Sequence, residues 1–327
     1  MKSTVASTVA LNTHNLSIGY EHGKNILLNN LNLTLSRGHM ICFMGPNGIG
    51  KSTLIRTLAG LQKPLNGTVT YASNKDLPQQ LAVVLTDRIS STELVVYDLI
   101  VFGRYPYLDW TIKLSDADKL KINEVINLIG IQSLVNKKID ELSDGQLQLV
   151  MIARALAQDC DIILLDEPTA HLDLNNRVEI MNLLRNIAHQ QNKAILVATH
   201  ELDLALQTAD KIWLAGLNQN VVTGMPEDLV LNGSFDEIFR FKGFDLKTGK
   251  IQHTAYRETA IALHGDGPEL LWTRNALERN GFIININAET TITLIKEAKT
   301  LTWKIKVNNS ETVCDSLESM INILCTN

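Results

Sequence analysis

The feature that most restricts the fold is an apolar run that passes directly into a glycine-rich loop and then into a helical pattern. Met40–Met44 is continuously apolar, as expected of a parallel strand that is buried on both faces. The residues that follow read GPNGIGKST and match the pattern G-x-x-x-x-G-K-[ST]. LIRTLAGL then continues with helical spacing. A strand, this loop and a helix in that order predict a phosphate-binding turn within an α/β domain.

The residue types of the loop suit the binding of phosphate. Glycines let the backbone approach oxygen atoms closely, and successive N–H groups can then point inward. Lys51 is expected to bridge the β- and γ-phosphate oxygens of a nucleotide, and Ser52 to ligate Mg²⁺. The alternative, a strand–helix turn that is merely rich in glycine, is disfavoured because the motif and its context agree. The predicted phosphate-contacting residues are Gly45, Pro46, Asn47, Gly48, Gly50, Lys51, Ser52 and Thr53.

Acidic and imidazole side chains follow two further apolar runs. Residues 162–165 lead into Asp166 and Glu167, and Ala194–Ala198 is followed closely by His200. Ligands of parallel α/β sheets gather at the carboxyl ends of the strands. We therefore predict that Asp166 holds Mg²⁺, directly or through water, and that Glu167 polarises the water that attacks the γ-phosphate. His200 is predicted to contact that phosphate or that water. The two carboxylates could instead cap a helix, but the presence of a phosphate loop earlier in the chain disfavours that interpretation.

The order of the patterns predicts the fold class. Buried strands alternate with helices, which indicates an α/β domain with a parallel sheet core. Short alternating runs within residues 11–35 predict an antiparallel β edge, and residues 88–158 a helical insertion. We expect this domain to span residues 11–245. Residues 251–327 carry alternating strand patterns and two helical patterns, so they predict a small α+β domain. The second helical face is expected to comprise Val313, Leu317, Met320, Ile321 and Leu324.

Composition narrows the class of protein further. The chain of 327 residues has a net charge of −5, so it lacks the basic character that nucleic-acid binding favours. No apolar stretch approaches the roughly 18 residues of a membrane helix, and no secretory signal is predicted. The cysteines lack metal or disulfide spacing, and Cys42 and Cys160 are expected to be buried thiols. These observations predict a soluble, cytosolic protein.

Several motifs occur together in a specific order. GPNGIGKST is followed by LSDGQ at 142–146, LLDEP at 164–168, AHLD at 170–173 and then His200. Over residues 11–245 this set resembles the ATP-binding cassette (ABC) ATPases. The resemblance implies a P-loop NTPase fold, hydrolysis of ATP with Mg²⁺, and a head-to-tail dimer. Because the chain has a single phosphate loop, we expect a homodimer.

The resemblance also implies roles for residues outside the phosphate loop. In such a dimer the signature LSDGQ faces the ATP bound by the partner, so Ser143, Gly145 and Gln146 are expected to contact that ATP in trans. Asp173 matches an aspartate of the dimer interface. Tyr20 matches the aromatic residue that stacks on adenine, although it could be an ordinary strand tyrosine.

Two residues depart from the pattern of the family. Asp144 stands where the signature has glycine, and we expect it to point away from the phosphate because a first-turn carboxylate complements the helix dipole. Asp87, or less favourably Thr86, stands where the family has a glutamine that touches Mg²⁺. A carboxylate there could ligate Mg²⁺ or interrupt the relay to the membrane partner, and the sequence leaves both open.

A further stretch bears on what the ATPase drives. VVYDLIVFGRYPY at 95–107 resembles the ATPases of importers for iron–siderophore, haem and vitamin B12. The resemblance implies a separate membrane permease contacted by this stretch, a substrate-binding protein, and a place on the cytoplasmic face of the inner membrane. The aromatic residues could instead be core of the helical insertion. Residues 251–327 lie outside the cassette resemblance, and we expect them to add a dimer contact or to regulate.

The alternative function is a soluble ATP-switched clamp that acts on nucleic acid or ribosomes. Such clamps carry a long coiled coil or two cassettes in one chain, and neither is evident here. The acidic balance also favours transport, and no nucleic-acid partner is expected.

Overall fold

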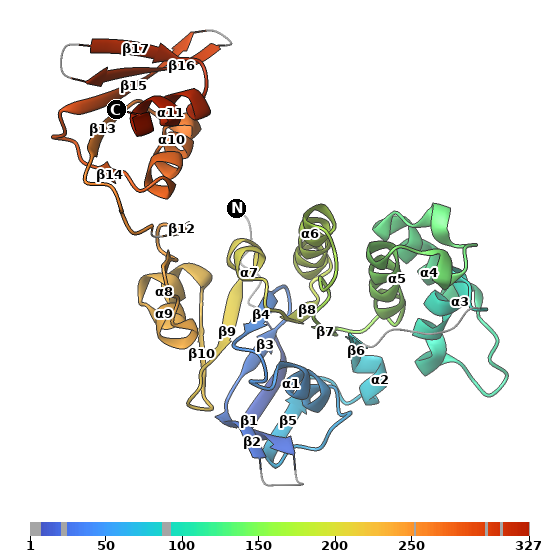
Figure 1. Ribbon diagram of the computed structural model, residues 1–327. Coiled ribbons are helices and arrows are strands. Elements are labelled where there is room, and N and C mark those ends of the chain that lie inside the picture. The colour runs from blue at the N-terminus through green and yellow to red at the C-terminus, as the bar shows by residue number, and fades with distance from the viewer. Residues whose placement is uncertain are drawn as a thin grey trace, which may run out of the picture. The chain divides into compact units, whose positions relative to one another are not determined.

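The computed structural model describes residues 8–20, 25–86, 93–251, 253–297, 300–307 and 310–326. The chain divides into two compact units, Met1–Arg240 and Phe241–Asn327. The first unit contains the phosphate loop, and the second contains a smaller sheet with its own helices (Figure 1).

A six-stranded sheet lies at the centre of the first unit, in the order β10-β9-β4-β8-β7-β6. The strands from β9 to β6 are parallel, and β10 pairs with β9 in the antiparallel direction. Every residue of β4, β7 and β8 is buried, which explains why these strands are continuously apolar. The bounds are β4 (Met40–Met44), β6 (Leu81–Val84), β7 (Ile162–Asp166), β8 (Ala194–Ala198), β9 (Lys211–Ala215) and β10 (Val221–Gly224).

A second sheet of four antiparallel strands packs beside the first. β1 is central in it, and β2, β3 and β5 all pair with β1. The bounds are β1 (Val9–Tyr20), β2 (Asn25–Leu31), β3 (Thr34–Ser36) and β5 (Asn66–Tyr71). The predicted α/β class, with a parallel core and an antiparallel edge, is therefore confirmed.

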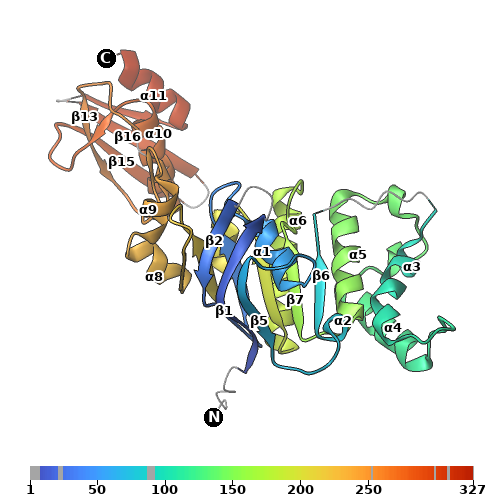
Figure 2. The ribbon, with the colours of Figure 1, turned by 90° about the horizontal axis from the view of Figure 1, so that it is seen from below.

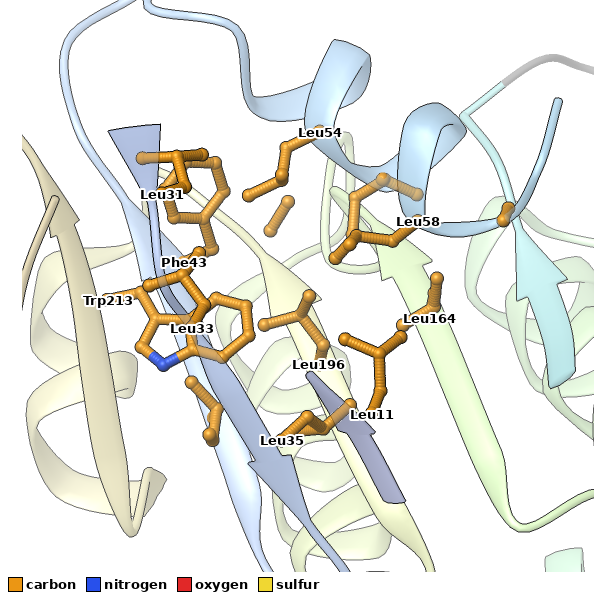
Figure 3. Close-up of a cluster of buried hydrophobic side chains, with 14 of the residues drawn as sticks. Leu11, Leu31, Leu33, Leu35, Phe43, Leu54, Leu58, Leu164, Leu196 and Trp213 are labelled. Carbon is orange, nitrogen blue, oxygen red and sulfur yellow. The ribbon is translucent and has the colours of Figure 1, made fainter. Parts of the chain in front are cut away.

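One apolar core joins the two sheets to α1 (Lys51–Leu58), as Figure 3 shows. Burying each large apolar side chain stabilises the fold by roughly 1.5–3 kcal/mol. This packing fixes the end of β4 and the start of α1, and so it fixes the phosphate loop between them. The core includes Leu11, Leu31, Leu33, Leu35, Phe43, Leu54, Leu58, Leu164, Leu196 and Trp213.

Helices cover both faces of the parallel sheet. α1 lies on one face, and α6 and α7 lie on the other (Figure 1). The helices of the unit outside the insertion are α2 (Leu77–Gln80), α6 (Leu174–Gln190), α7 (Leu202–Thr208), α8 (Pro226–Leu231) and α9 (Ser234–Phe239). Among the described residues, no helix combines the length and the apolarity that crossing a bilayer requires.

The predicted helical insertion lies between β6 and β7. It comprises α3 (Val96–Val101), η1 (Phe102–Tyr107), α4 (Asp116–Ile129), η2 (Gln132–Leu134), η3 (Ile139–Glu141) and α5 (Asp144–Ala157). α5 is held to β6 by side chains of its last turns. Arg154 donates to the Val83 carbonyl at 2.8 Å, and Gln158 donates to the Leu81 carbonyl at 2.9 Å.

Asp118 ties the start of α4 to η1. Its carboxylate accepts hydrogen bonds from the Ser115 N–H at 2.9 Å and from Arg104 Nε at 2.8 Å. Burial opposes ionisation of Asp118, but the bonds from Ser115 and Arg104 outweigh it and hold the pKa of Asp118 below its ordinary value. The resulting stabilisation is present above the ordinary aspartate pKa of about 4 and is lost as the pH falls through the lower folded-state pKa.

Asp118→Asn is expected to lower the free energy of unfolding by about 3 kcal/mol at pH 7, because Arg104 keeps its charge with little solvent around it. The difference from the unmodified protein should shrink as the pH falls from the ordinary aspartate pKa through the lower folded-state pKa of Asp118, because the unmodified protein then loses the interaction too. Urea denaturation at several pH values measures both effects. Asp116→Asn is the matched control, since Asp116 is exposed and, among the residues that the structure describes, its ion pair is with the exposed Lys119. Equal destabilisation by the two substitutions would contradict this account.

The second unit is a five-stranded sheet in the order β14-β13-β15-β16-β17, with α10 and α11 packed against it. Trp303 lies in its core and donates from Nε1 to Thr273 Oγ1 at 2.8 Å. A short antiparallel pair, β11 with β12, precedes the sheet. The bounds are β11 (Phe244–Asp245), β12 (Lys250–Ile251), β13 (Ala260–His264), α10 (Gly267–Arg279), β14 (Ile283–Ile284), β15 (Thr290–Glu297), β16 (Thr300–Val307), β17 (Ser310–Cys314) and α11 (Leu317–Thr326).

One expectation for the second unit is wrong. Val313 does not share a helical face with Leu317, because it lies in β17, pairs with Lys304 and is 61% exposed. The helix begins only after Ser316, whose hydroxyl accepts a hydrogen bond from the Ser319 N–H at 3.2 Å. The apolar spacing continues by chance across a strand end into a helix.

The expected buried thiols are present. Cys42 lies within β4 and Cys160 lies just before β7, and both are buried. Burial raises the pKa of each to about 12, with Asp210 adding to the effect at Cys42. Both are therefore protonated core residues at neutral pH.

Candidate active site at the carboxyl edge of the parallel sheet

The phosphate loop connects β4 to α1. Gly48 and Gly50 have φ values of 78° and 111°, in the region that favours glycine. A Cβ on Gly50 would also lie only 3.2 Å from Leu27 Cβ. Lys51, the first residue of α1, is 8% exposed and donates from Nζ to the Gly45 carbonyl at 3.2 Å. The backbone therefore holds the lysine ammonium over the loop.

Neighbouring strand ends bring the predicted catalytic side chains to this loop. The Glu167 N–H donates to the Ala198 carbonyl at 2.8 Å, which aligns the ends of β7 and β8. His200 Nδ1 then lies 2.6 Å from Glu167 Oε2, and Lys51 Nζ lies 3.9 Å from Glu167 Oε1. Lysine, glutamate and histidine thus form one cluster. In this structure the carboxylate that is predicted to act on water contacts both Lys51 and His200.

Asp166 has an unsatisfied oxygen beside the same cluster. The residue is 3% exposed, and its Oδ1 has no hydrogen-bond partner within the described chain. A buried carboxylate oxygen without a partner is costly, so it fits a site for a cation. Ser52 lies in the first turn of α1, as a Mg²⁺ ligand of this loop requires. In the described part of the chain, no group of three or more His, Cys, Asp or Glu side chains is placed to hold a metal ion.

Tyr20 lies at the end of β1, next to the start of α1. Its side chain is 51% exposed, and its hydroxyl lies 3.3 Å from Thr53 Oγ1. An exposed aromatic ring anchored beside the phosphate loop is available for stacking. Pro46 and Asn47 form the outer turn of the loop, where the Ile49 N–H donates to the Pro46 carbonyl at 3.3 Å.

The signature residues form the start of α5. Ser143 caps this helix, its Oγ accepting from the Gln146 N–H at 3.3 Å while Gln146 Oε1 accepts from the Ser143 N–H at 3.3 Å. Each of these side chains accepts a hydrogen bond from the backbone of the other residue, which closes the cap at the start of α5. In both ribbon views β6 lies between α5 and α1 (Figures 1 and 2). A single chain therefore does not bring the signature to its own phosphate loop.

Gly145 is buried against the start of α6. A Cβ on Gly145 would lie 3.1 Å from Nδ2 of Asn176. Asn176 donates from Nδ2 to Asp173 Oδ2 at 3.0 Å, and Asp173 caps α6 by accepting from the Asn176 N–H at 2.9 Å. A larger residue at this position would therefore require the Asn176 side chain to shift by a few tenths of an ångström.

Asp144 lies in the first turn of α5 and is exposed. It lines a hollow of about 70 Å³ together with Asp166, Glu167 and His171. Thr86 borders the same hollow and donates from Oγ1 to the Asp166 carbonyl at 3.2 Å. The other candidate for the glutamine position, Asp87, lies outside the described residues.

Two site residues were missed by the sequence analysis. Arg177, on α6, donates from Nη1 to Glu201 Oε2 at 3.0 Å, and Glu201 immediately follows His200. The acidic neighbour of the histidine was visible in the sequence, but nothing there pairs it with an arginine 24 positions earlier.

A P-loop ATPase cassette is the class that this fold and site define. The ABC transporter family model matches residues 28–170, and the iron ABC transporter C-terminal domain model matches residues 257–325. An uncharacterised ABC transporter ATP-binding protein of Methanocaldococcus jannaschii is 37% identical over 259 residues, which cover 74% of this chain and 89% of that protein. The chain belongs to the ABC transporter ATP-binding proteins, and it is an ATPase.

Further relatives and solved structures agree with this assignment. A probable siderophore transport system ATP-binding protein of Bacillus subtilis is 33% identical, over 70% of this chain and 86% of that protein. A petrobactin import ATP-binding protein of Bacillus anthracis is 34% identical, over 71% of this chain and 87% of that protein. The dimeric structure of an ATP-binding cassette bound to ADP and Pi is 27% identical with a TM-score of 0.57, over 66% of this chain and 98% of that chain.

Proposed function

We propose that this ATPase energises the import of an iron–siderophore, haem or cobalamin-type substrate through a separate membrane permease. The observation that carries the proposal is the pairing of the two family matches. The cassette is similar to siderophore and petrobactin import ATP-binding proteins, and the second unit matches the iron ABC transporter C-terminal domain. The substrate is therefore inferred to be a metal chelate rather than a sugar or an amino acid.

The catalytic roles follow from the cluster at the sheet edge. In the proposed reaction, a water oxygen bonds to the γ-phosphorus of ATP while the bond to the β–γ bridging oxygen breaks, which releases ADP and phosphate. Glu167 accepts the proton of that water, and Lys51 and His200 stabilise the charge on the γ-phosphate. The short contact between Glu167 and His200 supports these roles, since it brings the two side chains together at the same edge of the sheet. Lys51 must then leave Glu167 for the phosphate oxygens when ATP enters.

Mg²⁺ would be held by Ser52 and Asp166, and it would neutralise charge on the phosphate oxygens. The unsatisfied Oδ1 of Asp166 supports this assignment. Asp87 stays a candidate third ligand, and Thr86 is directed to the Asp166 carbonyl instead.

Completion of the site requires a second copy of the chain. Ser143, Gly145 and Gln146 are proposed to meet the γ-phosphate bound by the partner, because in their own chain β6 lies between α5 and α1 (Figures 1 and 2). The helix start behind them offers free N–H groups for an anion. Asp173 is proposed to lie in the same interface, and the dimeric structure of a similar cassette supports this arrangement.

The aromatic stretch of the insertion is proposed to contact the permease. Val96, Leu99 and Ile100 are buried and hold the stretch to the first unit. Phe102, Tyr105, Tyr107 and Trp110 are 38%, 49%, 38% and 92% exposed. A group of exposed aromatic side chains is unusual unless it meets a partner. The protein would then work at the cytoplasmic face of the inner membrane, beside a permease and its substrate-binding protein.

The proposal is tested by recovering partners from detergent-solubilised membranes, with Glu167→Gln held in ATP and Mg²⁺. A multi-span permease recovered in stoichiometric amount supports it, and Trp110→Ala with Tyr105→Ala should reduce that recovery. Tyr256→Ala is the matched control, because Tyr256 is 69% exposed but lies in the second unit. Ribosomes or nucleic acid in place of a permease would instead support the clamp, which the names of the relatives disfavour.

A further inference from the structure

The segment that joins β7 to α6 contains two residues in an unfavourable backbone conformation. Glu167 has a φ of 50° and His171 a φ of 65°, and neither is glycine. Such a conformation is unfavourable for any residue other than glycine, and it persists only when its surroundings hold it. The same segment carries the predicted catalytic base at one end and the proposed interface residue Asp173 at the other.

Arg177 holds this segment from α6. Its Nε donates to the Leu172 carbonyl at 2.6 Å, and its Nη1 lies 2.8 Å from Glu201 Oε1 and 3.0 Å from Oε2. One guanidinium thus binds the end of the strained segment and the residue after His200. Arg177 is 33% exposed and Glu201 is 17% exposed, so water screens this pair only in part.

Glu201 carries the constraint on to the catalytic cluster. Its Oε1 lies 3.8 Å from His200 Nε2, while the opposite ring nitrogen of His200 lies 2.6 Å from Glu167 Oε2. The Glu201 N–H also donates to Thr199 Oγ1 at 3.0 Å, which fixes the backbone at the turn after β8. A continuous chain of polar contacts therefore runs from the Leu172 carbonyl through Arg177, Glu201 and His200 to Glu167.

We infer that Arg177 and Glu201 are positioning residues for ATP hydrolysis. The pair fixes the position of the strained segment 167–173 relative to the imidazole of His200. Glu167 and His200 therefore keep their relative placement when the partner chain docks on Asp173. The inference rests on the catalytic roles proposed for Glu167 and His200. Neither Arg177 nor Glu201 touches the phosphate loop within the described residues.

The chemistry of the guanidinium suits this task. Arginine presents several N–H donors in a fixed fork, so it can bind a carbonyl and a carboxylate together. A lysine at this position would keep the charge opposite Glu201 but has no planar fork to reach both partners in the same geometry. Arg177→Lys should therefore retain part of the function, whereas Arg177→Met should lose it.

The test compares steady-state ATP hydrolysis and ADP affinity for Arg177→Met, Arg177→Lys, Glu201→Gln and the double variant Arg177→Met/Glu201→Gln. We expect kcat to fall about tenfold in Arg177→Met, because small misplacements of reacting groups are costly in rate. The dissociation constant for ADP, measured by calorimetry with Mg²⁺, should change less than about twofold. The kcat of Arg177→Lys should lie between that of the unmodified protein and that of Arg177→Met. The double variant should be no slower than the slower single variant, since the two residues act as one unit.

Arg185→Met is the matched control on the same helix. Arg185 is exposed and makes no hydrogen bond or ion pair among the residues that the structure describes, so its kcat should be unchanged. The inference is overturned if Arg177→Met keeps kcat within twofold, if the effects of the two single variants multiply, or if ADP affinity falls in parallel with kcat. Should Arg177→Met fail to fold, Glu201→Gln carries the test, because it preserves side-chain shape.

Glu167→Gln belongs in the same series as a reference. If it hydrolyses ATP at the normal rate, the proposed catalytic assignment fails whatever Arg177 does. If it stalls while Arg177→Met remains normal, only the positioning role fails.

Discussion

Glu167→Gln is expected to lower the rate of ATP hydrolysis at least about a hundredfold while ATP still binds. An amide cannot accept the proton of the attacking water, and general-base catalysis contributes roughly 10²–10⁴ in rate. The amide keeps the shape of the carboxylate, and removing its charge leaves Lys51 freer to meet the γ-phosphate, because Lys51 lies 3.9 Å from this carboxylate. With hydrolysis stalled, the ATP-bound dimer should accumulate. Phosphate release measures the first effect, and size-exclusion chromatography with ATP and Mg²⁺ measures the second.

Glu179→Gln provides the control for this substitution. Glu179 lies on α6, is exposed and makes no hydrogen bond or ion pair within the described residues. The Glu179→Gln variant should hydrolyse ATP at the normal rate, and its oligomeric state with ATP and Mg²⁺ should match that of the unmodified chain. Normal turnover by Glu167→Gln would show that another group accepts the proton. Loss of ATP binding would show instead that the carboxylate organises the loop.

The strands that position the site were predictable because burial on both faces leaves a strong pattern. β4, β7 and β8 are buried at every residue, so their sequences are unbroken apolar runs. Once these are taken as parallel neighbours, the residues after them must meet at one edge. That reasoning placed Glu167 and His200 near each other from positions 33 residues apart, and their side chains lie 2.6 Å apart.

Contacts made by single polar side chains left no comparable pattern. Arg177 reads as an exposed helix residue in an amphipathic sequence, and only the tertiary fold brings it to Glu201 and to the Leu172 carbonyl. The small sheet of the second unit was harder for a related reason. β14 has only two residues, too few for alternation to be recognised, and the apolar Val313 faces away from the core. Hydrophobic periodicity in a sequence reflects burial over several consecutive residues. It therefore does not detect elements that are short or exposed.

Lys51→Ala is expected to weaken ATP binding about tenfold to a hundredfold and to reduce turnover as well. The ammonium is buried and donates to the Gly45 carbonyl, so it stands ready at the loop and needs little reorganisation to meet phosphate oxygens. A hydrogen bond to a charged group contributes roughly 1.5–3 kcal/mol, which sets this range. Calorimetry with ATP and Mg²⁺ measures the affinity. Lys63→Ala is the control, because Lys63 is exposed beyond the end of α1.

The two substitutions separate binding from chemistry at one site. Glu167→Gln should keep affinity and lose rate, whereas Lys51→Ala should lose affinity, because the lysine acts on ATP both before and during the reaction. Removing Lys51 also deprives Glu167 of its lysine partner and leaves it in contact with His200. If Lys51→Ala bound ATP with unchanged affinity, the lysine would serve mainly to hold Glu167. In that case freeing Lys51 from the Glu167 carboxylate should not raise the affinity for ATP, so Glu167→Gln should bind ATP equally well with and without Lys51, which the double variant would reveal.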